Sequence, residues 1–222
     1  MRRFMAGYVR VVERLNYVVG RGAMYLIFVM IAVLLWSSFT KVAPFMRPSL
    51  WTLEVAQFLM VAYFILGGPY SIQLGTNVRM DLVYGALSPR KKAALDVVTV
   101  FCLITFLIFL LYGGLNSLAY SLGHFSGQAV QFLSGLVATF LTGGPDAAAA
   151  ELGVMERSRS VWRPVLWPIK LVMVLGIVLM LLQAVAELFK DIDHALTGRP
   201  PSGPHEPPAP DPRAPAPGEA TR

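Results

Sequence analysis

The sequence is poor in the residues on which most soluble proteins depend. Charged residues make up 14% of the 222 residues, against about 25% in a typical soluble domain. Hydrophobic residues make up 55%, and the mean hydropathy is +0.58. The single cysteine, Cys102, lies inside an apolar run, which excludes a disulfide framework and is typical of a small buried hydrophobic residue. A chain with so little polar surface cannot cover itself in water, so the composition predicts an integral membrane protein.

Histidine is also scarce, and the motifs of cofactor and catalytic sites are missing. The three histidines (His124, His194 and His205) lie at or beyond the predicted span ends, where they cannot face each other as haem ligands inside a bundle. No CxxC, HExxH, P-loop or GxSxG pattern occurs, so zinc, nucleotide and serine-hydrolase chemistry have no starting point. The predicted spans contain three acids, Glu54, Asp96 and Glu187, and of these we single out only Glu54 as a candidate, which is too few for a catalytic pair. We therefore expect no enzyme activity, no cofactor and no metal.

Four apolar stretches are long enough to cross a bilayer, which takes about 20 mostly apolar residues in a helix. We place these spans at about 23–43, 52–74, 94–121 and 165–188. The fourth reaches full length only if Lys170 extends its ammonium group toward the headgroups. The predicted fold class is an all-α integral membrane protein, with a four-helix membrane domain over residues 23–193.

The distribution of basic residues predicts the orientation in the membrane. Five precede the first span (Arg2, Arg3, Arg10, Arg14 and Arg21), and four lie between the second and third spans (Arg79, Arg90, Lys91 and Lys92). The first hairpin has only Lys41 and Arg47. Loops rich in Lys and Arg stay in the cytoplasm, so both termini are predicted to be cytoplasmic. The net charge of +6 is then a topology signal and does not indicate a nucleic-acid partner.

The two ends of the chain are predicted to differ from the membrane domain. Residues 1–22 carry apolar side chains at helical spacing (Phe4, Tyr8, Val11, Val12, Leu15, Val18 and Val19), with charged residues on another face. This pattern predicts an amphipathic helix in the cytoplasmic interface, attracted by anionic lipid headgroups. The alternative is an ordinary basic tail with accidental periodicity. From Gly198 onward nine of 25 residues are proline, so residues 194–222 are predicted to be a disordered cytoplasmic tail.

The insert between the third and fourth spans, residues 124–164, is harder to interpret. Residues 128–142 are uncharged and have an apolar side at helical spacing, but the apolar part is short for a span. The segment is interfacial, re-entrant or a fifth span. The basic-residue count does not decide, because 13 would be cytoplasmic with either four or five spans. Its length favours an amphipathic periplasmic insert.

A few polar and small residues within the spans need partners. Glu54 is expected to form an ion pair with Lys41, Arg47 or a basic residue of another subunit. Gln183 is expected to bond to another helix more readily than to a substrate. Three small residues lie four apart and favour close helix packing, within this chain or with another: Gly113, Ser117 and Ser121.

Several motifs, taken in order, resemble a known family. Trp51-Thr-Leu-Glu54 opens the second span, and Asn77-Val-Arg79-Met-Asp81-Leu and Leu87-Ser-Pro-Arg follow it. This order resembles the small membrane subunit of tripartite ATP-independent periplasmic (TRAP) transporters, which typically carries an HVRVD-like hairpin after a W-x-x-E helix start. A later stretch is similar to the mannitol/chloroaromatic branch: Glu156-Arg-Ser158, then Trp162-Arg-Pro-Val-Leu-Trp167-Pro-Ile-Lys170 and Gly176. The resemblance covers about residues 15–193, and Asn77 stands where the family usually has histidine.

The resemblance implies a three-part importer in a bacterial inner membrane. A periplasmic binding protein would deliver an organic acid to a large permease subunit, which would move it with a sodium gradient. This chain would then be a non-catalytic scaffold that contacts membrane lipids and the large subunit. The residues marked as candidate interface or structural positions are Trp51, Glu54, Asn77, Arg79, Asp81, Trp167, Lys170 and Gln183. The alternatives are a membrane anchor of an oxidoreductase or other complex, and a self-sufficient small transporter or channel.

Overall fold

The structure, a computed structural model, describes residues 2–43, 45, 47–74 and 89–197. Its helices are α1 (Arg2–Met24), α2 (Leu26–Val42), α3 (Thr52–Gln73), α5 (Pro89–Ser121), α6 (Ala129–Ala150) and α7 (Trp167–Thr197). In the described part of the chain there is no strand, only an isolated antiparallel bridge between Arg157 and Val165. Within the described ranges, four helical segments are long and apolar enough to cross a membrane: Met5–Val42, Thr52–Gln73, Val98–Ser121 and Trp167–Lys190. The predicted fold class, all-α with four spans, is confirmed.

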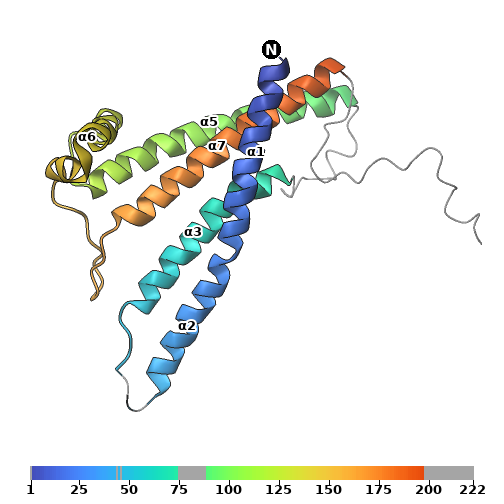
Figure 1. The fold of residues 1–222 in the computed structure, drawn as a ribbon. Coiled ribbons are helices and arrows are strands. Elements are labelled where there is room, and N and C mark those ends of the chain that lie inside the picture. The colour runs from blue at the N-terminus through green and yellow to red at the C-terminus, as the bar shows by residue number, and fades with distance from the viewer. Residues whose placement is uncertain (1, 44, 46, 75–88, 198–222) are drawn as a thin grey trace, which may run out of the picture.

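The helices form a splayed bundle around α7 (Figure 1). Helix α7 packs against α1, α3 and α5. In its apolar 18-residue stretch 33% of the residues are buried, compared with 11% in the corresponding stretch of each of the other three segments. We call the end formed by residues 43–51 and 122–166 the loop end, and the opposite end, where α3 and α7 finish, the N-terminal end. Leu107 and Ile177 join α5 to α7 near the middle, and Leu118 and Val174 do so toward the loop end. Helix α7 is therefore the central element that positions the others.

Helix α1 belongs to the bundle as well as to the first span. It is nearly in line with α2 across a break at Tyr25 (Figure 1), and it packs on α3 and α7. Its contact face is the stripe Val12, Asn16, Gly20 and Ala23, all of which are buried. The placement of α1 in the membrane interface stays a prediction.

Two glycines let helices approach α3 closely. A Cβ atom on Gly176 of α7 would lie 2.1 Å from Ile65 Cγ2 and 3.0 Å from the Ile65 carbonyl oxygen. A Cβ atom on Gly20 of α1 would lie 2.5 Å from Tyr70 Cβ. Close backbone approach at small residues is the usual way in which helices associate within lipid. These two positions fix α3 between α1 and α7.

Helix α6 lies across the loop end and does not run beside the spans. Figure 1 shows it nearly end-on while α5 and α7 run across the view. Phe132 and Leu133 of α6 pack against the part of the α5–α7 contact that includes Leu118. Gly144, with φ of 80°, interrupts helix α6 just before Pro145. Helix α6 is not among the four candidate spans. The five-span alternative is therefore not supported.

The predicted boundaries agree best for the second span, where 52–74 corresponds to Thr52–Gln73. Helix α7 continues to Thr197, so residues 194–197, which the sequence analysis placed in the tail, are helical. The rest of the predicted tail, 198–222, lies outside the described residues.

Candidate functional site

Polar side chains of the bundle gather at its two ends. At the N-terminal end they come from α1 and α7, and we call this group the clasp: Glu13, Asn16, Gln183, Glu187 and Lys190. Asn16 Nδ2 donates to Gln183 Oε1 at 2.7 Å, and Gln183 Nε2 donates to Glu187 Oε1 at 2.8 Å. Both Asn16 and Gln183 are fully buried. The clasp gives Gln183 and Asn16 Nδ2 the partners that water would otherwise supply, since burying an unpaired amide is costly, whereas Asn16 Oδ1 has no partner among the described residues.

The clasp also contains an ion-pair network. The Lys190 ammonium group pairs with Glu13 of α1 and, at 2.9 Å, with Glu187 of its own helix. All three side chains are largely buried. Nearby, the Tyr8 hydroxyl donates to the Leu182 carbonyl at 3.2 Å. One lysine thus pairs with carboxylates from two helices and ties α1 to α7.

The outer surface of α1 has two distinct stripes. Arg10, Arg14 and Arg21 form a basic stripe, and the exposed side chains of Val11, Leu15 and Val18 form an apolar stripe beside it. A basic stripe next to an exposed apolar stripe suits the boundary between lipid headgroups and acyl chains. Part of the apolar face predicted from periodicity thus points away from the bundle.

At the loop end the chain folds back on itself as a hairpin, residues 153–166. Its backbone is tied to the end of α5 by two hydrogen bonds, from Gly153 N to Leu122 O and from Glu156 N to Ser121 O, both at 3.0 Å. The two arms pair through Ser158 N to Pro164 O at 2.9 Å. The hairpin is therefore a fixed structure.

Two predicted residues hold this hairpin. Glu54 Oε1, at the start of α3, accepts a hydrogen bond from the Ser158 hydroxyl at 2.6 Å. Lys170 of α7 pairs with Glu156 and also donates to the Ser117 carbonyl at 3.3 Å. The hairpin thus joins the loop ends of α3, α5 and α7, which diverge there in Figure 1.

Among the residues that the structure describes, Glu54 does not have the cation partner expected for it. Neither Lys41 nor Arg47 pairs with it in the described part of the structure, and the Ser158 hydroxyl is its partner instead. Glu54 is 8% exposed, and its Oε2 has no hydrogen-bond partner among the described residues. The Ser158 hydroxyl reaches Glu54 because the hairpin folds over the start of α3. Hydropathy along the sequence does not indicate this fold of the hairpin.

The remaining predicted positions fall into three groups. Trp51, just before α3, is partly exposed, and Trp167 opens α7 and packs beside Leu118. Gln183 has the helix partner expected for it, supplied by α1. Asn77, Arg79 and Asp81 lie outside the described residues. Their role in subunit contact stays a prediction.

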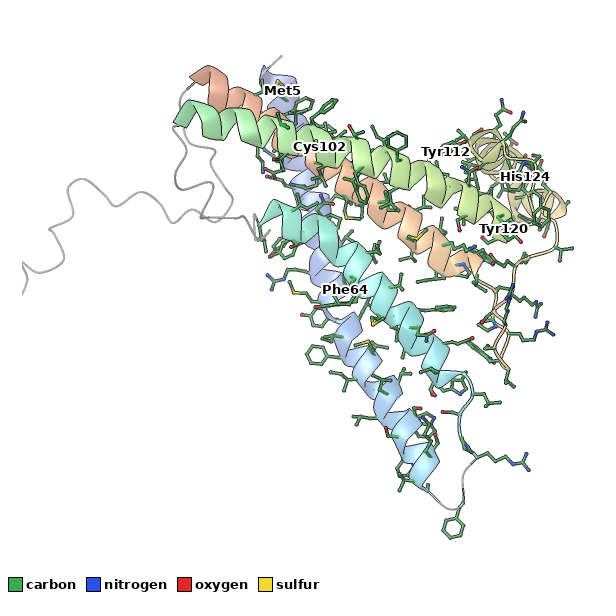
Figure 2. All side chains as sticks on the ribbon, turned by 180° about the vertical axis from the view of Figure 1, so that it is seen from behind. Met5, Phe64, Cys102, Tyr112, Tyr120 and His124 are labelled. Carbon is green, nitrogen blue, oxygen red and sulfur yellow. The ribbon has the colours of Figure 1, made fainter. Side chains whose placement is uncertain are left out.

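The three small residues of α5 have different surroundings. A Cβ atom on Gly113 would have nothing within 4 Å, whereas its neighbour Gly114 faces α7 side chains at 3.4–3.7 Å. Ser121 is fully buried and its hydroxyl bonds to its own helix, while Ser117 contributes its carbonyl to Lys170. Gly113 is therefore free to approach a neighbour outside this chain. Figure 2 shows the adjacent Tyr112 projecting from α5.

Sequence reasoning missed Glu13 and Asn16, and it named Glu156 and Ser158 only as part of the branch-like stretch, without the contacts that they make. Asn16 carried a usable signal, because an amide at helical spacing from Val12 interrupts an apolar pattern. The sequence carried no signal for the bond between Ser158 and Glu54, since the two residues are 104 positions apart. Across the part of the chain that the structure describes, no group of three or more metal-ligating side chains occurs.

The sequence of most of the bundle matches one known family. The family model described as tripartite ATP-independent periplasmic transporters, DctQ component, matches residues 30–194. The chain belongs to this family. The match runs from within α2 to near the end of α7, so it includes all of the hairpin and the α7 half of the clasp. Searches of curated proteins and of solved structures give no significant match.

Membership makes this DctQ component a small membrane subunit of a TRAP transporter, a multi-pass protein of the inner membrane. The family resemblance drawn from Trp51-Thr-Leu-Glu54 and the following motifs is confirmed. The family is one of transporter components, so the oxidoreductase-anchor alternative is not favoured.

Proposed function

We propose that this DctQ component is a non-catalytic scaffold for the large permease subunit of its transporter. The large subunit moves an organic acid with a sodium gradient, after a periplasmic binding protein has delivered the substrate. We assign the chain to the mannitol/chloroaromatic branch on the Trp162 to Lys170 stretch. The observation that carries the proposal is the family match across α2 to α7.

The use of polar groups supports a scaffold role. A transport site is usually built at the membrane midplane from interrupted helices and polar side chains. Here the polar groups of the clasp, apart from Asn16 Oδ1, bond to one another, and Glu54 and Lys170 hold the hairpin through Ser158 and Glu156. Large apolar side chains instead face outward from α2 and α5, such as Phe28 and Phe109. This surface suits lipid and a large membrane partner.

Co-purification and uptake test the scaffold role. A tagged chain should retain the large subunit in detergent, and sodium-dependent uptake of organic acid into proteoliposomes should require both chains together with the binding protein. Uptake by this chain alone would contradict the proposal. A haem absorbance band in the purified complex would favour the oxidoreductase anchor instead.

The proposed orientation has a direct test in cysteine labelling. Val161 lies in the hairpin and is 79% exposed, so Val161→Cys in a Cys102→Ser background should react with a membrane-impermeant maleimide in intact spheroplasts. Arg199→Cys should react only after permeabilisation, because the C-terminus is proposed to be cytoplasmic. The reverse labelling pattern would show that the orientation is inverted.

A further inference from the structure

We propose that the hairpin of residues 153–166 is the docking element for an acidic surface of the periplasmic binding protein. This inference rests on the proposed function, because it needs that partner and a periplasmic loop end. It names a contact surface that a scaffold role by itself does not require.

The first observation is unused positive charge. Arg157, Arg159 and Arg163 are all exposed, and none forms an ion pair within the described residues. The only acid in the hairpin, Glu156, is taken up by Lys170. Three free guanidinium groups therefore remain on one short segment. Arginine is the side chain best suited to bidentate recognition of carboxylates.

The second observation is an apolar tip between these arginines. Val161 is 79% exposed and Trp162 is 45% exposed. An exposed aromatic and aliphatic pair flanked by arginines has the composition of a protein contact centre, in which Trp and Arg contribute most of the energy. A partner surface with an apolar hollow for Val161 and Trp162, surrounded by acidic side chains for the arginines, would complement this tip.

The third observation is that hydrogen bonds and an ion pair brace the hairpin up to its tip. Arg163 has φ of 50°, a left-handed value that costs energy for a residue other than glycine, and its N–H donates to Ser160 Oγ at 3.2 Å. The Ser158 hydroxyl is fixed by Glu54, and Lys170 fixes Glu156. A preorganised loop reduces the entropy lost on binding a shaped protein surface. Fluid headgroups need no such order, so the geometry favours a protein over the lipid surface.

The fourth observation concerns charge placement. In the proposed orientation, cytoplasmic segments are expected to hold the excess of Lys and Arg. The hairpin instead places three arginines at the periplasmic end. A binding function explains why positive charge is found on this side.

The test uses the complex of small and large subunits in lipid nanodiscs and a fluorescently labelled periplasmic binding protein. Wild-type complex should bind at 50 mM salt, and binding should weaken at 500 mM because charge pairs at an interface are screened. The triple variant Arg157→Gln, Arg159→Gln, Arg163→Gln should raise Kd at least tenfold at 50 mM salt and flatten the salt dependence. A Kd within twofold of wild type would overturn the docking role.

A matched triple variant at the other end of the molecule controls for net charge. Arg10→Gln, Arg14→Gln and Arg21→Gln remove the same charge from α1 and should leave Kd within twofold of wild type. An equal rise in Kd in both triple variants would overturn the assignment to the hairpin.

A positioning variant tests the fixed geometry separately from the charges. Ser158→Ala removes the bond to Glu54 and the bond that the Ser158 hydroxyl accepts from Ser160 N, but it removes no charge. It should raise Kd about three- to fivefold and leave the salt dependence unchanged, since the arginines remain. An unchanged Kd would show that the Glu54 contact does not position the hairpin for docking.

The remaining outcomes separate this inference from the proposed function. If the small subunit fails to retain the large one, the scaffold role fails and the docking inference falls with it. If the complex forms but wild-type nanodiscs do not bind the binding protein at 50 mM salt, only the docking inference is overturned. Labelling of Val161→Cys that is blocked by anionic lipid, with Kd unchanged in the hairpin triple variant, would identify a lipid contact and also overturn it.

Discussion

Replacing Gly176 with alanine is expected to destabilise the bundle by about 1–3 kcal/mol, the usual cost of overpacking a closely packed contact. The new Cβ atom would lie 2.1 Å from Ile65 Cγ2 and 3.0 Å from a backbone oxygen of α3. The side chain of Ile65 can rotate, but the carbonyl oxygen moves only with the helix. Helices α3 and α7 must therefore separate. A lower apparent melting temperature of the purified protein in detergent would report this.

Gly113→Ala is the matched control for this prediction. A Cβ atom at Gly113 has nothing within 4 Å, so the substitution should change stability by less than about 0.5 kcal/mol or raise it slightly, because alanine favours helix more than glycine does. Equal losses for the two variants would mean that α3 and α7 do not meet at Gly176.

Lys190→Met is expected to detach α1 from α7. The substitution leaves the Glu13 and Glu187 carboxylates facing each other, largely buried and without a cation. Removing one partner of a buried ion pair typically costs about 3–5 kcal/mol; partial exposure of these side chains places the expected loss at the lower end of that range. Faster backbone hydrogen exchange around Asn16, with less change in α5, would report the detachment.

A triple variant distinguishes loss of charge balance from loss of packing. Lys190→Met combined with Glu13→Gln and Glu187→Gln removes all three charges and keeps similar side-chain volumes. It should recover most of the stability lost in Lys190→Met, because no uncompensated charge remains. No recovery would show that the aliphatic stem of Lys190, rather than its charge, holds α1.

The spans were predictable because the length and apolarity of a membrane helix are local properties. Residues 52–74 correspond to Thr52–Gln73, with Trp51 immediately before the helix, because the apolar run and its polar flanks are contiguous in the sequence. The same reasoning indicated that residues 128–142 are short for a span, and α6 is not among the candidate spans.

The packing face of α1 was less predictable. Periodicity grouped Val11, Leu15 and Val18 with the apolar face, but these side chains are exposed, whereas Asn16 and Gly20 are buried. In a soluble protein the apolar face marks the core, but a surface in contact with lipid is apolar as well. Hydrophobic periodicity therefore does not distinguish contact with a helix from contact with lipid.

The sequence by itself determined that this is a four-span membrane protein, and its ordered motifs indicated the TRAP transporter family that the family match confirms. Only the tertiary structure showed that Asn16 is bonded to Gln183 and Glu54 to Ser158. The physical reason is that insertion into a bilayer depends on local hydropathy, whereas each of these bonds joins residues more than 100 positions apart. Which polar groups meet depends on where α1 and the hairpin dock on α7, α5 and α3, and on the glycines that let the helices approach.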